Sequence, residues 1–189
     1  MSVAGPHSVL EELWSPVAAL TAAHDGRAGG MITSTAVTAS LLPESPRIAV
    51  LLAGGHRTQE LALASGAFAI HLLPAEPVER SLEIFRTLGF RSGRDVDKLA
   101  GIPWRPGATG APLLEEALAY VEARIVRTLD AEDVTVVLAD VVGGARLREG
   151  HHLTIEVVRA HLTSDDRSAW DARLAEELLE ARRRRVTRA

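Results

Sequence analysis

The 189-residue sequence contains no cysteine, so disulfide bonds, thiolate nucleophiles and cysteine-ligated metals are excluded. Aromatic residues make up only 4% of the chain, and the core must therefore be built mainly from Ala, Val, Leu and Ile. No apolar run approaches the roughly 20 residues that a membrane-spanning helix needs. The N-terminus lacks a basic segment followed by an apolar one, so we expect no secretory signal and a cytoplasmic protein.

The charge balance and composition are those of an ordinary globular domain. A formal net charge of −4 argues against a chain whose main role is to bind nucleic acid. Hydrophobic residues make up 47% and charged residues 24%, which argues against disorder. Because neither an internal repeat nor a second core is visible, we expect one domain over residues 1–189, with a barrel over about 14–160 and a C-terminal helix over about 166–186.

Short apolar segments separated by proline and glycine predict a mainly β structure with peripheral helices. We expect these strands to form a closed antiparallel barrel, with a hairpin turn at Asp25-Gly26. The run Arg47–Ala53 is continuously apolar after its first residue, so we expect it to be buried on both faces. The other expected strands are Pro16–Ala23, Met31–Ser40, Ala67–Leu73, Ala117–Leu129, Val134–Val142 and Leu153–Val158.

Helices are expected at the periphery of this barrel. One begins at Arg57, with Thr58 as its cap, and ends before Gly66. The next follows Pro77 and buries a face made of Val78, Leu82, Phe85 and Leu88. The remaining expected helices are a short one over Val9–Trp14, a single turn over Asp95–Leu99, and a terminal helix from Ser168 onward with Trp170, Leu174 and Leu178 on one face.

The segment Gly29–Leu41 is the most informative stretch of the chain. Its two leading glycines allow a tight turn or the close approach of another group. It also carries five hydroxyl side chains among apolar ones, and these can present O–H and N–H groups to a polar ligand: Thr33, Ser34, Thr35, Thr38 and Ser40. The alternative is an ordinary strand edge whose hydroxyls face water.

Taken with the segments around it, this stretch resembles the flavin reductase-like family, which has the FMN-binding split-barrel fold. The resemblance covers roughly Pro16 to Leu147 and depends on the order and spacing of several segments. These are Pro16–Ala23, Asp25-Gly26-Arg27, Gly29–Leu41, Pro46–Leu52, His56-Arg57-Thr58, Lys98–Gly107 and Ala111–Glu115.

The resemblance implies an FMN site and a hydride donor, with no metal. It places the phosphate of FMN at Arg57 and Thr58, where a guanidinium and a helix start both favour an anion. Ser34, Thr38 and Ser40 match the hydroxyl positions of the family best, and Thr33 and Thr35 lie close to them. FAD is the alternative flavin, and either NADH or NADPH is the donor. Hydride transfer needs mainly the correct stacking of two rings, so we assign no catalytic residue.

The resemblance also implies a function: an NAD(P)H-dependent flavin oxidoreductase, homodimeric, that supplies reduced flavin to a partner monooxygenase. Two departures favour an alternative. Where many relatives carry an acidic residue followed by His and Thr, this chain has Asp133-Val134-Thr135, and Leu153–Val158 lacks the usual Tyr and Arg. The alternative is a split-barrel protein that binds flavin but is not a general reductase. A third class is a barrel with no cofactor.

Two other patterns receive a structural interpretation. His151, His152 and His161 lie near the C-terminal end, but adjacent strand residues point to opposite faces, so we expect no metal site. The run Arg182–Arg185 is interpreted as favourable charge at a helix C-terminus or as a disordered tail.

Overall fold

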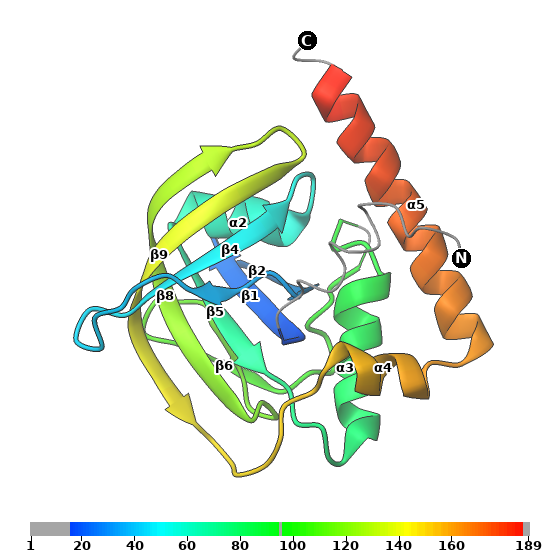
Figure 1. The fold of residues 1–189 in the computed structure, drawn as a ribbon, viewed down its shortest axis with the longest axis horizontal. Helices are drawn as coiled ribbons and strands as arrows, with labels where there is room; N and C mark the ends of the chain where they lie inside the picture. The colour runs from blue at the N-terminus through cyan, green and yellow to red at the C-terminus, as the bar shows by residue number, and fades with distance from the viewer. Residues whose placement is uncertain (1–15, 95, 187–189) are drawn as a thin grey trace, which may run out of the picture.

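The computed structural model describes residues 16–94 and 96–186. A seven-stranded antiparallel sheet, in the order β2-β1-β5-β8-β9-β4-β3, curls around itself, and a two-stranded sheet pairs β6 with β7 (Figure 1). The strands are β1 (Ala18–His24), β2 (Arg27–Thr33), β3 (Val37–Thr38), β4 (Arg47–Ala53), β5 (Ala67–Leu72), β6 (Trp104–Pro106), β7 (Pro112–Leu114), β8 (Ala119–Asp130) and β9 (Val134–Arg146). The helices are α2 (Arg57–Ser65), α3 (Val78–Phe90), α4 (Ile155–His161) and α5 (Ser164–Val186).

The fold is mainly β and its sheet is antiparallel, as predicted, but the sheet does not close into a complete barrel. Its edges are β2 and β3, and the chain leaves the ladder after Thr33. A side chain crosses the remaining gap, because the hydroxyl of Thr35 donates to the carbonyl of Leu51 at 3.1 Å and accepts from its amide at 3.1 Å. The expectation of a closed barrel is therefore corrected to a split one.

The β1–β2 hairpin forms at the predicted turn, with positive φ at both Asp25 (49°) and Gly26 (71°). Gly29 and Gly30, however, lie within β2 and make no turn of their own. A Cβ on Gly30 would lie 2.9 Å from a methyl of Leu88 in α3, and one on Gly29 would lie 3.1 Å from a methyl of Leu61 in α2. The glycines therefore let the two helices approach β2 closely, and β2 starts four residues before the expected Met31.

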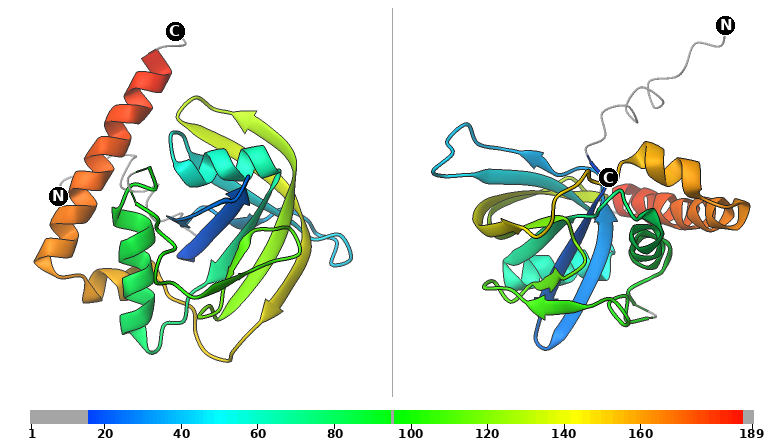
Figure 2. Two further views of the ribbon diagram at one scale, coloured as in Figure 1. Left: turned by 180° about the vertical axis from the view of Figure 1, so that it is seen from behind. Right: turned by 90° about the horizontal axis from the view of Figure 1, so that it is seen from below.

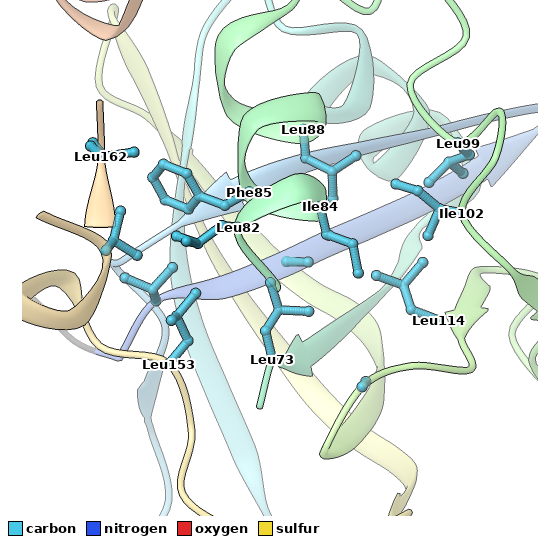
Figure 3. Close-up of a cluster of buried hydrophobic side chains, with 14 residues drawn as sticks. Leu73, Leu82, Ile84, Phe85, Leu88, Leu99, Ile102, Leu114, Leu153 and Leu162 are labelled. Atoms are coloured by element: carbon cyan, nitrogen blue, oxygen red, sulfur yellow. The ribbon is translucent and has the colours of Figure 1, made fainter. Parts of the chain in front are cut away.

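Two large apolar clusters hold the fold together, with a small third one at Ala69, Ala111 and Leu113. Residues of β1, β2, β4, β5, β8 and β9 pack with Leu61 and Ala62 of α2 inside the curl of the sheet. On the other side, α3 packs Leu82, Phe85 and Leu88 against the sheet, as its spacing predicted, with Val78 partly buried beside them. Figure 3 shows Leu82, Phe85 and Leu88 between two flanks of the cluster. One flank is formed by Leu153 and Leu162, and the other by Leu99, Ile102 and Leu114.

Four expectations were wrong in their details. The segment Leu153–Val158 is not a strand: Thr154 caps α4 by accepting from the amide of Val157, and Ile155, Val158 and Leu162 follow a helical period. Strand β4 has the predicted bounds but is not buried on both faces, since Leu51 is 40% exposed. The N-cap of α2 is His56, which makes no side-chain cap bond, while Thr58 is buried inside the helix.

The fourth concerns the single helical turn expected over Asp95–Leu99: within the described residues, 96 and 97 are irregular and a non-helical turn runs over 98–101. The helix expected over Val9–Trp14 lies outside the described residues.

Helix α5 starts a few residues earlier than expected and lies beside α3 and α4 on one side of the sheet (Figure 2). Its first turns are fixed by a two-pronged pair between Arg86 and Asp166 (2.8 and 2.9 Å) and by the packing of Trp170 on Phe85 and Phe90. Leu174 and Leu178 are 46% and 48% exposed, and no residue of α5 is buried. Helical structure continues through Arg182–Arg185, which excludes a disordered tail there. Within the described residues, no helix has the length and apolar character to span a membrane.

A buried histidine in this core makes stability depend on pH. The amide of Leu114 donates to Nε2 of His71, so the proton lies on Nδ1, 3.2 Å from the carbonyl of Ala19. Burial lowers the pKa of His71 from 6.5 to about 4. Below pH 6.5, His71 binds a proton in the unfolded chain but stays neutral in the folded chain. The free energy of unfolding therefore falls as the pH is lowered to about 4.

We expect the titration of His71 to lower the free energy of unfolding by about 2 kcal/mol between pH 7.5 and pH 5. The measurement is urea unfolding at both values for the wild type and for His71→Gln. The variant should lose less stability over this interval; an equal loss in both proteins would show that His71 does not carry the effect.

Candidate functional site

A cavity of about 330 Å³ opens at the split between β2 and β4 and is walled by α3 and α5. We call it the split cavity. Its volume lies at the lower end of the range of small-molecule sites, roughly 300–1,000 Å³. Its lining residues are Val17, Met31, Ile32, Thr33, Ser34, Thr35, Leu51, Ala53, His56, Phe85, Leu88, Gly89, Phe90, Val134, Ile155, Trp170, Arg173, Leu174 and Glu177.

Three of the predicted hydroxyl residues, Thr33, Ser34 and Thr35, line this cavity together. The hydroxyls of Thr33 and Thr35 lie 3.0 Å apart, and Thr35 is also engaged with Leu51 across the split. Ser34 is half-buried, and its hydroxyl has no hydrogen-bond partner among the described residues. Ser34 is therefore the hydroxyl with the most capacity to bind a ligand, and its two neighbours are held rigidly by the protein.

Thr38 and Ser40 do not join them. Thr38 lies in the edge strand β3 and is exposed, and the hydroxyl of Ser40 accepts from the amide of Leu42 at 3.1 Å. The chain turns away from the cavity after Thr35, so the five hydroxyl positions separate into a lining group and an outer group. Neither Thr38 nor Ser40 lines the split cavity.

Arg57 and Thr58 begin α2 next to the cavity without lining it. The guanidinium of Arg57 lies 3.4 Å from the carboxylate of Glu60 and faces a second cavity, of about 390 Å³, shared with Arg27. Thr58 is only 3% exposed, and its hydroxyl would lie 3.2 Å from a Cβ on Gly29. The N-cap residue His56 makes no side-chain hydrogen bond to the first N–H groups of α2. The helix start remains a suitable place for an anion.

A cluster of titratable and charged side chains lies at the wall of the split cavity formed by α5, and the sequence analysis did not predict it. Nε2 of His56 lies 3.1 Å from Oε1 of Glu177, and the same oxygen lies 3.0 Å from Nε of Arg173. Burial opposes the ionisation of Glu177, but the contacts with His56 and Arg173 outweigh it and hold the pKa of this carboxyl below its usual value. No motif marks these residues, because only the docking of α5 brings them to His56.

Beneath this group, Lys98 is buried and donates from Nζ to the carbonyl of Leu88 at 2.6 Å. Burial, reinforced by the charge of Arg173, lowers the pKa of Lys98 to about 8. One buried group behind this wall, Lys98, therefore changes its charge close to pH 8.

The far half of α5 is also attached by charged residues. A Cβ on Gly54 would lie 2.9 Å from a guanidinium nitrogen of Arg184, so glycine there lets the guanidinium pack on the backbone. Arg185 reaches Asp133 in the β8–β9 turn at 3.0 Å. Beside the contact of Gly54 with Arg184 lies a third cavity, of about 310 Å³, which shares His56, Arg173 and Glu177 with the split cavity. Helix α5 therefore extends past the split from α3 to the β8–β9 turn.

Comparison with known proteins identifies the family to which the chain is similar. A family model described as "Flavin reductase like domain" matches residues 10–169. A Moorella thermoacetica protein named high molecular weight rubredoxin is 32% identical over 136 residues, covering 71% of this chain and 57% of that protein. The reductase subunit HsaB of a flavin-dependent monooxygenase from Mycobacterium tuberculosis is 28% identical over 134 residues, covering 71% of this chain and 67% of that one.

Among solved structures, the NADH:FAD oxidoreductase SgcE6 of Streptomyces globisporus superposes with a TM-score of 0.68 at 22% identity. The superposition covers 82% of this chain and 93% of that one, which shows a shared fold. Within residues 16–94 and 96–186, no group of three or more His, Asp or Glu side chains is arranged to hold a metal ion.

Proposed function

This chain belongs to the flavin reductase-like family, and on that premise we propose that it is an NAD(P)H-dependent flavin oxidoreductase whose flavin occupies the split cavity. The observation that supports this most directly is the position of Thr33, Ser34 and Thr35. They line a cavity of suitable size at the split of the sheet. We favour FMN as the flavin and keep FAD as the alternative.

The residues present suit such a cofactor. Apolar side chains such as Met31, Phe85 and Leu88 offer surface for a tricyclic ring, and the hydroxyl of Ser34 offers a polar partner for its edge. His56 lines the cavity directly before Arg57, so a phosphate carried on the ribityl chain would reach the first turn of α2. The same positions would hold either flavin through its ribityl phosphate.

Bound flavin supplies the hydride acceptor, and a nicotinamide dinucleotide supplies the hydride. The protein contributes by positioning the two rings and by excluding water from the contact. Thr33 and Thr35 fix the edge of the split through their bonds to each other and to Leu51, and Ser34 stands between them with its hydroxyl available. No acid or base side chain is required for the hydride step.

The test is spectroscopic. Purified protein should bind FMN with an absorbance maximum at about 450 nm, as expected of oxidised flavin. This band should bleach when NADH or NADPH is added without oxygen. Binding without bleaching by either nucleotide would reject the reductase activity and leave a flavin-binding protein; absence of binding would reject both.

Arg57 remains a predicted phosphate ligand. We expect Arg57→Ala to weaken FMN binding about tenfold, because a guanidinium paired with a phosphate forms charge-assisted bonds. Fluorescence titration of FMN measures the change. Arg27→Ala is the matched control, since Arg27 lines the same second cavity but lies outside α2, and its affinity should match the wild type. Unchanged affinity in Arg57→Ala would remove this residue from the phosphate site.

One observation favours the alternative of a flavin-binding protein that is not a general reductase. Val134, which stands where many relatives carry histidine, lines the split cavity itself. An apolar side chain there cannot donate a hydrogen bond to a nicotinamide or a flavin. The bleaching experiment separates this alternative from the primary proposal.

We also propose a homodimer and a partner monooxygenase. The β3–β4 connection exposes Leu41 completely and Leu42 by 56%, and such apolar surface is suited to a second copy of the chain. Light scattering should give twice the mass of the chain. The relative named as a monooxygenase reductase subunit supports an oxygenase as the recipient of reduced flavin. The expected cytoplasmic location stays a prediction.

A further inference from the structure

His56, Glu177 and Arg173 meet where α5 crosses the start of α2. One carboxylate oxygen of Glu177 lies 3.1 Å from His56 Nε2 and 3.0 Å from Arg173 Nε. The side chain of His56 is 14% exposed, that of Arg173 19% and that of Glu177 33%. All three line the split cavity. The two separations are ion-pair distances, and neither His56 Nε2 nor Arg173 Nε makes a hydrogen bond within the described residues. A histidine beside a carboxylate, with Nε2 free to donate, therefore faces the space in which the flavin is proposed to bind.

The charge of this trio depends on His56 alone. Arginine keeps its charge at all ordinary pH values, and Glu177 is held ionised by its two partners. The trio thus carries one net positive charge when His56 is protonated and none when it is neutral. Other charged groups surround it: Arg57 and Glu60 in α2, Arg94, Lys98 and Asp133 in turns and loops, and Glu176, Glu180, Arg183, Arg184 and Arg185 in α5.

Hydride transfer changes the charge in the cavity. NAD(P)H gives up two electrons and one proton, so the flavin that receives them gains one negative charge until a second proton arrives from solvent. A fixed positive group beside this charge stabilises it, and the effect is larger in a site that excludes water. A protonated His56 is such a group.

Resting on the proposed function, we infer that His56 is the positive group that makes this site favour reduced over oxidised flavin, and that Glu177 of α5 is its positioning residue. Glu177 lies beyond residue 169, where the match to the family ends. The carboxylate therefore comes from the part of α5 that lies beyond the matched residues, while most of the residues that line the cavity lie within them.

The test compares binding of oxidised and reduced FMN. His56→Asn should reduce the preference for reduced FMN about tenfold, which lowers the midpoint potential of bound FMN by about 30 mV for a two-electron couple. His56→Lys restores a positive charge and should retain the wild-type preference. His161→Asn is the matched control, because His161 is exposed at the end of α4 and does not line the cavity.

A second variant tests the role of Glu177. Removing a negative charge would by itself favour the anionic reduced FMN. If Glu177 instead acts by orienting His56, Glu177→Gln should reduce the preference for reduced FMN, as His56→Asn does. Glu176→Gln is the adjacent control, since Glu176 pairs only with the outer nitrogen of Arg173. The charge of Glu177 also raises the pKa of Lys98, so the variants are compared at about pH 6, below the pKa of about 8 that Lys98 has in the folded protein.

The outcomes separate the two proposals. If the wild type binds no FMN, the proposed function fails. If it binds FMN but His56→Asn has the wild-type potential, or Glu177→Gln keeps or increases the preference for reduced FMN, only the present inference is overturned. If His56→Asn loses FMN altogether, His56→Lys decides: the wild-type preference supports the role of charge, and any other result overturns it.

Discussion

Gly89→Phe is expected to abolish FMN binding, weakening it by about 1,000-fold or more, which corresponds to about 4 kcal/mol. Gly89 is the penultimate residue of α3 and lines the split cavity. A Cβ there would lie 3.5 Å from Ile32, an ordinary contact, so the backbone accepts a side chain. A phenyl group extending from this point would fill the space proposed for the ring. The measurement is FMN titration followed by fluorescence.

Gly89→Ala provides the control for this variant. Its methyl group fits beside Ile32, and alanine is favoured over glycine in a helix by as much as about 1 kcal/mol. We expect Gly89→Ala to bind FMN like the wild type and to unfold at a slightly higher urea concentration. If Gly89→Phe is folded and still binds FMN normally, the flavin does not occupy the split cavity.

Phe85→Ala is expected to lower the unfolding free energy by about 3–5 kcal/mol, the usual result of removing a buried phenyl group from a core. Phe85 is 3% exposed and joins three parts of the structure. It lies in the cluster beneath α3, and its ring centroid is 5.7 Å from that of Phe90 and 5.5 Å from that of Trp170 in α5. Denaturant unfolding measures the loss.

Phe90→Ala tests whether this loss depends on burial. The ring centroid of Phe90 lies 6.2 Å from that of Trp170, but Phe90 is only partly buried. Its replacement should therefore lower the free energy of unfolding markedly less. Equal losses in the two variants would indicate that the aromatic contacts with α5, rather than the buried cluster, hold α3 in place.

Local signals in the sequence were sufficient for much of the fold. The bounds of β4 agree residue for residue with the prediction, and the turn at Asp25-Gly26 and the buried face of α3 were also confirmed. Each depends on chemistry within a few residues: positive φ in a two-residue turn, or a helical period of apolar side chains. The family and the split-barrel fold followed from the order of such segments.

The errors arose where a local signal was ambiguous or where distant segments meet. Ile155, Val157 and Val158 are β-branched and suggested a strand, but the cap at Thr154 and packing under α3 favour a helix. Gly29 and Gly30 predicted either a tight turn or a close approach; the close approach is present, but the two helices that make it lie elsewhere in the chain and could not be identified locally. For the same reason the sequence could not show that Glu177 would reach His56, or that Thr38 and Ser40 would lie away from Thr33 and Thr35.

Helix α5 has a consequence for how such a protein can change over time. It buries none of its residues, yet four of them line the split cavity and several more line the third cavity beside it. Apart from Trp170, which packs on Phe85 and Phe90, substitutions along this helix therefore disturb the packed interior very little while altering the charges that line the cavity. Such a helix can diversify in sequence without endangering the fold of the rest of the chain.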